Sequence, residues 1–246
     1  NKYENKIQLS GQIIDNKIVL IELLNGKPNG RFEGKIFTDN LDRFEGFWTD
    51  NSNIKSIENL THDVLRIVTE KPVGLVFQTG QAADISLNKS GWENELRPFT
   101  FTSLPQDDFV EFIIKTYPTH NGVTNQLCSL VAGDELIIGD VFGDIHYKGE
   151  GVFIAGGAGV TPFIAILKQL EKENKIGNNK LIFANKTKAD IILEEKLKSL
   201  LGANFINVLS DEKVEGYVNG FISSDIIKTK IEGRKYFYLC GPPPMM

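Results

Sequence analysis

The stretch GVFIAGGAGVTPFIAILKQL, residues 151–170, reads as a strand, a glycine turn and the start of a helix. Residues 152–155 form a short apolar run, which is typical of a strand buried on both faces. Three residues without a Cβ follow, and they allow a tight turn and the close approach of a ligand: Gly156, Gly157 and Gly159. A strand–helix connection without a ligand would carry the same letters, so this stretch alone does not assign a function.

The helix after this turn has its own start signals. Thr161 is a candidate N-cap and Pro162 a candidate first helical residue, with Val160 just before them. The free N–H groups of such a helix would face back over the glycine turn. That end of a helix favours an anion.

Downstream, the hydrophobic period changes from two to 3.6, and strands alternate with helices. Strands are predicted over 152–155, 181–185, 204–210 and 235–240. Thr187, followed three residues later by Asp190, forms a capping box that predicts the start of the second helix. This alternation indicates an α/β fold with a doubly wound parallel sheet.

Ligands of such sheets bind beyond the carboxyl ends of the strands. Four short segments fall there: 156–161, 185–187, 210–211 and 240–243. Because the strand ends meet at one edge of the sheet, we expect these segments to line one crevice. This convergence favours a binding function over a purely structural reading.

Residues 53–148 read instead as short strands with glycine and proline turns, predicted over 64–70, 81–87, 97–103, 108–117 and 135–143. Such a pattern predicts a closed antiparallel β-barrel, with a short helix over 124–130. In RPFTFTS, residues 97–103, an arginine, an aromatic ring and a hydroxyl stand together and could bind a phosphate and a flat ring. An ordinary strand with one exposed arginine would also explain these letters.

Residues 1–52 predict a small antiparallel β-meander of unassigned role, with strands at 6–13, 17–24, 31–38 and 43–50. The polar run TDNSN, residues 49–53, is the predicted boundary to the barrel. We therefore predict three units, 1–52, 53–148 and 149–246. Phe47 and Trp48 are more simply explained by packing than by binding.

Composition restricts the function further. With 246 residues, 41% of them hydrophobic, the chain can bury ample core, and its net charge of −5 without basic runs argues against nucleic-acid binding. Cys128 and Cys240 are too few for a cysteine-ligated metal or cluster, and their count suits a reducing compartment. The three histidines show no ligand spacing, so we expect no metal site. Without a long apolar run or a signal peptide, we expect a cytoplasmic protein with no membrane contact.

Taken in order, RPFTFTS, HNGVTNQL, GGAGVTPF and CGPPPM resemble the ferredoxin-NADP reductase family of flavoproteins over residues 54–246. The resemblance implies a barrel that binds FAD, followed by an α/β domain that binds NAD(P)H. It implies these FAD-binding residues: Arg97 at the pyrophosphate, with Pro98, Phe99 and Thr100 at the isoalloxazine and its N5, Ile114, Lys115 and Tyr117 along the ribityl and adenylate side, and Asn121, Gly122, Val123 and Thr124 at the pyrophosphate.

The resemblance also implies the residues at NAD(P)H. These are Gly156, Gly157, Gly159, Val160, Thr161 and Pro162 at the pyrophosphate, Thr161 and Cys240 beside the nicotinamide, Gly241 and Pro242 shaping the pocket, and Ser210 and Asp211 near the ribose. Thr100 and Cys240 flank the path of the hydride. Because two carboxylates follow Ser210 and would repel a 2′-phosphate, NADH is expected to be preferred over NADPH.

Three departures from the family pattern stand out. Asn121 occupies the position where the family has a glycine, although asparagine tolerates unusual φ values. The chain stops at Met246, inside the last motif, so the family's C-terminal tail is absent from this sequence. The meander is not part of the pattern.

The function implied is an FAD-dependent NAD(P)H oxidoreductase that passes hydride from nicotinamide to flavin and then single electrons to ferredoxin or flavodoxin. Two alternatives stay open. One is a non-catalytic FAD- and dinucleotide-binding module, and the other is the reductase component of an oxygenase system.

Overall fold

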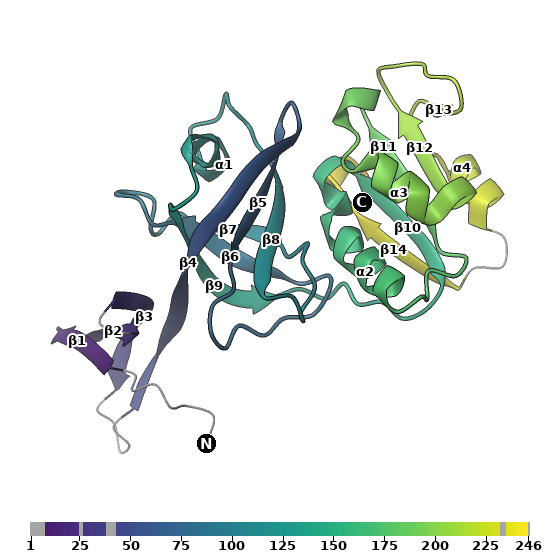
Figure 1. The fold of residues 1–246 in the computed structure, drawn as a ribbon. Coiled ribbons are helices and arrows are strands. Elements are labelled where there is room, and N and C mark those ends of the chain that lie inside the picture. Colours follow the sequence, from purple (N-terminus) through teal and green to yellow (C-terminus); the bar gives the residue numbers. More distant parts are fainter. Residues whose placement is uncertain (1–7, 25–26, 38–42, 232–234, 246) are drawn as a thin grey trace.

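The computed structural model describes residues 8–24, 27–37, 43–231 and 235–245. The chain folds into a nine-stranded antiparallel sheet followed by a five-stranded parallel sheet with helices (Figure 1). The predicted fold class is thus confirmed. Within the described ranges, no helix is both long and apolar enough to cross a membrane.

Part of the first sheet closes into a barrel. Its ladder runs β4–β5–β8 on one side and β4–β9–β6–β7 on the other, and an antiparallel bridge between Phe101 and Phe112 joins β7 to β8. Both rings are fully buried, and Phe101 also stacks on Phe77 at 4.1 Å. The strands are β4 (Arg43–Thr61), β5 (Val64–Glu70), β6 (Ala82–Leu87), β7 (Arg97–Thr100), β8 (Phe109–Lys115) and β9 (Glu135–Phe142). Between β8 and β9 lie α1 (Val123–Gln126) and a 3₁₀ turn, Leu127–Ser129, where the short helix was predicted.

The predicted meander is formed by β1 (Gln8–Ile14), β2 (Lys17–Leu24), β3 (Lys27–Phe37) and the first half of β4. The predicted break at 49–53 is not seen, because β4 runs through it and changes partners: it pairs with β3 up to Asp50, with β9 over 50–53 and with β5 from Ile54. Figure 1 shows this long strand leaving the meander and entering the barrel. The division into three units stays a prediction. The Phe47 side chain lies outside the described set, and Trp48 Nε1 donates to Asp50 Oδ1 at 2.8 Å.

The parallel sheet has the order β13-β12-β11-β10-β14. Its strands are β10 (Gly151–Gly156), β11 (Lys180–Asn185), β12 (Phe205–Leu209), β13 (Val218–Asn219) and β14 (Tyr236–Cys240), and its helices are α2 (Thr161–Lys172), α3 (Glu194–Leu201) and α4 (Ser224–Ile231). Apolar side chains of α2 and α3 pack on one face with Phe153 and Phe183. Ile227 of α4 packs on the other face with Ile154 and Ile182, so the sheet is doubly wound.

Two predicted helix starts are corrected. Val160 is the N-cap of α2 and Thr161 is its first residue, with a helical φ of −56°, and the Thr161 hydroxyl donates to the Ala158 carbonyl at 3.0 Å. The capping box of Thr187 and Asp190 is formed, but it caps the 3₁₀ turn Lys188–Asp190. Helix α3 begins only at Glu194, after Leu193 adopts a left-handed φ of 54°.

The barrel and the α/β domain are packed against each other. Val64 and Ile113 of the barrel belong to the same buried cluster as α2 and α3. Lys168 of α2 donates to the carboxylate of Glu111 on β8 at 2.6 Å and to the carbonyl of Thr102 at 2.8 Å. Burial alone raises the pKa of a carboxyl, but Lys168, Thr102 and Arg66 hold the pKa of Glu111 below its ordinary value.

Replacing Lys168 by methionine is expected to lower the free energy of unfolding at pH 7 by about 1–3 kcal/mol, because Glu111 would keep a buried charge with fewer partners. A depressed carboxyl pKa contributes stability above the unfolded-state pKa, and this contribution is lost as pH falls through the folded-state pKa. The difference between variant and parent should therefore shrink in acid. Urea unfolding at pH 7 and at lower pH measures this difference, and the exposed Lys172→Met is the control. A difference in the free energy of unfolding that does not shrink in acid would contradict the role given to Glu111.

Candidate functional site

A cavity of about 970 Å³ opens at the carboxyl ends of the parallel strands. The last or next residue of four strands lines it: Gly156 of β10, Asn185 of β11, Ser210 after β12 and Gly241 after β14. The wall is completed by the loop that leads into α4 and by Lys115 and Tyr117 of the barrel. The cavity therefore lies where the two domains meet, and the predicted crevice is formed.

The glycine turn forms the floor of this cavity. Gly157 has a φ of 51°, a left-handed value that L side chains rarely adopt, and no atom lies within 4 Å of the position its Cβ would take. At Gly156 a Cβ would come within 2.9 Å of Met245 Sδ and Pro242 Cδ, and at Gly159 it would clash with the Cys240 carbonyl. The absence of side chains thus lets the turn pack against the segment after β14 on one side and leaves open space over Gly157.

The structure brings together only part of the predicted dinucleotide site. The predicted dinucleotide residues that line the cavity are Gly156, Gly157, Gly159, Ser210, Gly241 and Pro242. Two residues predicted for FAD, Lys115 and Tyr117, line it as well. The predicted dinucleotide residues that do not line it are Val160, Thr161, Pro162, Asp211 and Cys240. The first three of these are buried, because they belong to the face of α2 and the turn that packs on the sheet.

Two further residues of the cavity have properties that suit a dinucleotide. The Asn185 side chain is 9% exposed, and its Nδ2 finds no hydrogen-bond partner among the described residues. A buried donor without a partner is costly, so a bound molecule with an acceptor would satisfy it. Phe221 is 81% exposed at the cavity and offers a flat ring on which a base can stack. Asn185 was predicted in the crevice because it ends a strand of the parallel sheet. Nothing in the sequence distinguished Phe221 from a packing phenylalanine.

Cys240 closes β14 beside the glycine turn and is half-buried. Burial raises the pKa of its thiol. The thiol is therefore protonated near neutral pH, which suits a small packing residue and not a nucleophile.

On the barrel, the predicted flavin residues 97–100 form β7, and Ile114 and Lys115 end β8; the bridge between Phe101 and Phe112 makes these strands neighbours. The Arg97 side chain is 46% exposed, and its described contacts are local: Nη1 donates to the Leu96 carbonyl at 2.6 Å, and Nη2 lies 3.6 Å from a Glu95 oxygen. Pro98 is exposed, Thr100 is half-buried, and Phe99 packs partly against the barrel core. Ile114 is buried, so its side chain does not face a ligand on the barrel surface.

The helix predicted over 124–130 begins one residue earlier, at Val123. Gly122 is its N-cap, with extended backbone and no side-chain cap. The N–H groups of Asn125 and Gln126 donate to the Gly122 carbonyl. No atom lies within 4 Å of the position a Cβ of Gly122 would take, and Val123 is buried. The loop is thus open on its outer side at Gly122, and the contribution of Asn121 stays a prediction.

Lys115 and Tyr117 are the residues of the barrel that line the cavity. The Lys115 ammonium lies 2.6 Å from Asp63 Oδ2, and the Tyr117 ring stacks on His120 at 5.5 Å between centroids. A cation and an aromatic ring of the barrel therefore line the same cavity as the glycine turn. Both features suit an anionic, ring-containing cofactor.

Two family models match overlapping parts of the chain. Residues 49–182 match the family model described as an FAD-binding domain, and residues 153–246 match the model described as an oxidoreductase NAD-binding domain. The propane 2-monooxygenase reductase component of Rhodococcus jostii is 27% identical over 79% of this chain and 57% of its own length. The NADH-cytochrome b5 reductase 1 of Pyricularia oryzae is 30% identical over 71% of this chain and 61% of its own length.

Among solved structures, the CS and b5R domains of human Ncb5or in the NAD⁺ form are similar in fold, with a TM-score of 0.72 and 23% identity. That match covers 99% of this chain and 84% of the other, so it includes the meander. The chain spans about three fifths of the length of the two curated relatives.

Proposed function

Because the chain belongs to the ferredoxin-NADP reductase family of FAD- and NAD-binding oxidoreductases, we propose that it is an NADH-dependent flavoprotein reductase. It would pass a hydride from the nicotinamide to FAD and then single electrons to a redox protein. The observation that carries the proposal is the cavity between the domains, which joins the glycine turn of the α/β domain to Lys115 and Tyr117 of the barrel.

On the dinucleotide side, the chain supplies binding and orientation. The open space over Gly157 admits the pyrophosphate, the Asn185 amide donates a hydrogen bond, and the exposed Phe221 ring receives the adenine. The protonated Cys240 thiol shapes the pocket beside the nicotinamide. Holding both rings in one geometry removes much of the entropy cost of the transfer.

On the flavin side, Arg97 binds the pyrophosphate as a bidentate donor, and Phe99 and Thr100 lie against the isoalloxazine. FAD, when bound, accepts the hydride and releases its electrons one at a time. The Thr100 hydroxyl provides a hydrogen bond near N5, and the contact between the domains limits water at the transfer path.

The acceptor is a one-electron redox protein in this proposal, with ferredoxin or flavodoxin as the partners implied by the sequence resemblance. A second candidate is a haem protein such as cytochrome b5 or the partner component of an oxygenase, because the relatives with 27–30% identity carry such names. Reduction rates measured with each purified acceptor rank these candidates.

The visible spectrum of the purified protein tests the proposal. We expect flavin bands near those of other flavoproteins and their anaerobic bleaching by NADH, followed by reoxidation with a one-electron acceptor. A yellow protein whose bands NADH does not bleach would favour the non-catalytic binding module. A colourless protein that takes up no added FAD would refute both.

We expect kcat/KM to be about tenfold higher for NADH than for NADPH, which needs only about 1.4 kcal/mol. Asp211, which accepts from the Ser210 hydroxyl at 2.6 Å, and the neighbouring Glu212 place negative charge beside the cavity wall. Asp211→Asn should reduce the preference, and Glu215→Gln serves as control. A clear advantage for NADPH would instead point to Lys186, which lines the cavity, or to Lys213.

A further inference from the structure

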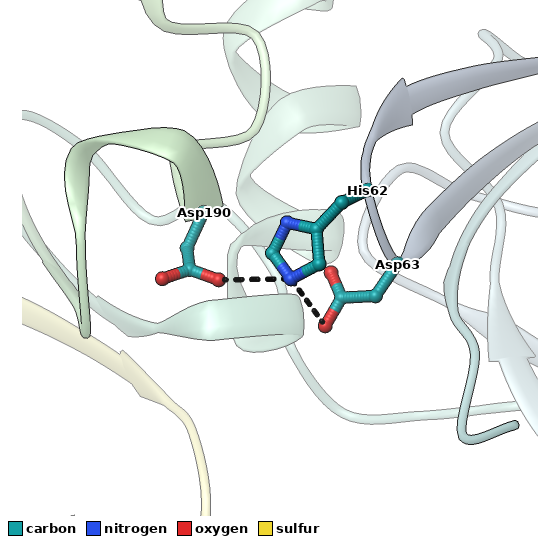
Figure 2. A group of neighbouring side chains, drawn as sticks. All are labelled: His62, Asp63 and Asp190. Atoms are coloured by element: carbon teal, nitrogen blue, oxygen red, sulfur yellow. Dashed lines mark ion pairs between the residues drawn. The ribbon is translucent and has the colours of Figure 1, made fainter.

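A histidine and two aspartates from different domains meet at the edge of the domain contact (Figure 2). His62 and Asp63 lie in the turn between β4 and β5 of the barrel, and Asp190 ends the 3₁₀ turn before α3. His62 Nε2 lies 3.7 Å from Asp63 Oδ2 and 3.8 Å from Asp190 Oδ1. One ligand atom from each residue lies within 4.8 Å of those of the other two.

We propose that His62, Asp63 and Asp190 form a Zn²⁺ site that bridges the two domains. An imidazole nitrogen and two carboxylate oxygens, with water in the fourth position, are a ligand set that zinc accepts. Ligand atoms about 2.0–2.2 Å from a tetrahedral zinc stand roughly 3.3–3.6 Å from one another. The two distances from His62 Nε2 therefore need to contract by a few tenths of an ångström. The exposed His62 side chain is free to make this adjustment. The two carboxylate oxygens, which lie within 4.8 Å of each other, need to approach by at most about 1.5 Å.

Both carboxylates are already oriented by a second hydrogen bond. The hydroxyl and the N–H of Thr187 donate to Asp190 Oδ2 at 2.7 and 2.8 Å, which leaves Oδ1 toward His62. The Thr61 hydroxyl donates to Asp63 Oδ1 at 3.1 Å, which leaves Oδ2 toward His62. Such outer contacts fix ligand direction at metal sites.

Lys115 sets the strength of the site. Its ammonium lies 2.6 Å from Asp63 Oδ2, the same oxygen that faces His62. Zinc and this ammonium compete for one oxygen and repel each other, so the lysine weakens zinc binding. This competition distinguishes the proposed site from random binding at surface carboxylates.

The test is Zn²⁺ binding by the tag-free, metal-stripped full chain, measured by competition with a chromogenic chelator. We expect one Zn²⁺ per chain with a dissociation constant in the micromolar range. His62→Ala and Asp190→Asn should each weaken binding about tenfold or more. His146→Ala, which removes an exposed histidine elsewhere, should leave it unchanged, and Lys115→Met should tighten it.

Equal affinity of the parent and His62→Ala would overturn the proposal, and so would weaker binding by Lys115→Met. If Asp190→Asn disturbs the fold by losing its bond to Thr187, far-UV circular dichroism reveals it. In that case His62→Gln, an exposed change of similar size, decides the result on its own: unchanged zinc affinity counts against the site and loss of affinity supports it.

Discussion

Replacing Gly157 by valine is expected to raise the KM for NADH at least tenfold while the FAD content stays at the level of the parent. The glycine turn lies on the α/β domain, and the predicted flavin residues lie on the barrel, so the two ligands should respond separately. Tenfold corresponds to about 1.4 kcal/mol. Steady-state kinetics with a one-electron dye and the flavin absorbance of the same preparation give both values.

Two physical effects act at this position. The φ of 51° disfavours a β-branched residue, and the side chain would fill the open space over the turn. Gly157→Asn separates them, because asparagine tolerates a left-handed φ but still occupies the space. If filling the space is what matters, Gly157→Asn should raise the KM nearly as much as valine does.

Gly202→Val is the matched control for strain. Gly202 has a φ of 54° and open space at the position of its Cβ, but it ends α3 and does not line the cavity. This variant should lose stability without a change in KM. An unchanged KM in a folded Gly157→Val protein would show that the dinucleotide does not lie on this turn.

The glycine turn was predictable from sequence because its reason is local. The backbone conformation there is determined by residues within a dozen positions. These are an apolar run, residues without a Cβ and a proline at the helix start. The same holds for the four predicted strands of the α/β domain, which fall within about a residue of the observed bounds, whereas the two-residue strand β13 was not predicted. The exact cap was not predicted: Val160 takes the N-cap position, and the Thr161 hydroxyl donates to the Ala158 carbonyl three residues earlier.

Strand β4 runs through the predicted boundary at 49–53 for a tertiary reason, while the boundary itself stays a prediction. The dipeptide Asp–Asn occurs three times, and the copy at 39–40 lies outside the described residues. At 15–16 it makes the turn between β1 and β2, with φ values of 48° and 63°. At 50–51 it lies inside β4, where Asp50 accepts from Trp48 and Asn51 donates to Glu135 of β9. Polar residues inside a strand are tolerated when they form hydrogen bonds to a neighbouring strand. A single sequence does not show which strands will be neighbours.

The outline of the cavity at the strand ends was predictable from the sequence. Strand ends of a parallel sheet meet by geometry, so Gly156, Asn185 and Ser210 were expected together. The exposure of Phe221 and the approach of Asp190 to His62 depend on how loops and domains pack. No spacing along the chain carries that information, and an isolated phenylalanine or histidine is usually a packing or surface residue.

Replacing Arg97 by alanine is expected to weaken FAD binding about ten- to a hundredfold, so that the protein purifies largely without flavin. A charge-assisted, bidentate contact to a pyrophosphate is worth roughly 1.5–3 kcal/mol. The fold should tolerate the change, because the guanidinium is half-exposed and its described contacts are to the neighbouring residues Leu96 and Glu95. Flavin released per mole of protein and titration of the apoprotein with FAD give the two measurements.

Two further variants decide what the arginine contributes. Arg97→Lys keeps the charge but loses the planar fork, so it should bind FAD with intermediate affinity. Glu95→Gln removes the carboxylate 3.6 Å from Nη2 and leaves the guanidinium in place, so the flavin content should stay the same or rise. Full FAD occupancy in Arg97→Ala would place the pyrophosphate elsewhere, and the loop at Gly122, open where a Cβ would stand, would then be the next position to test.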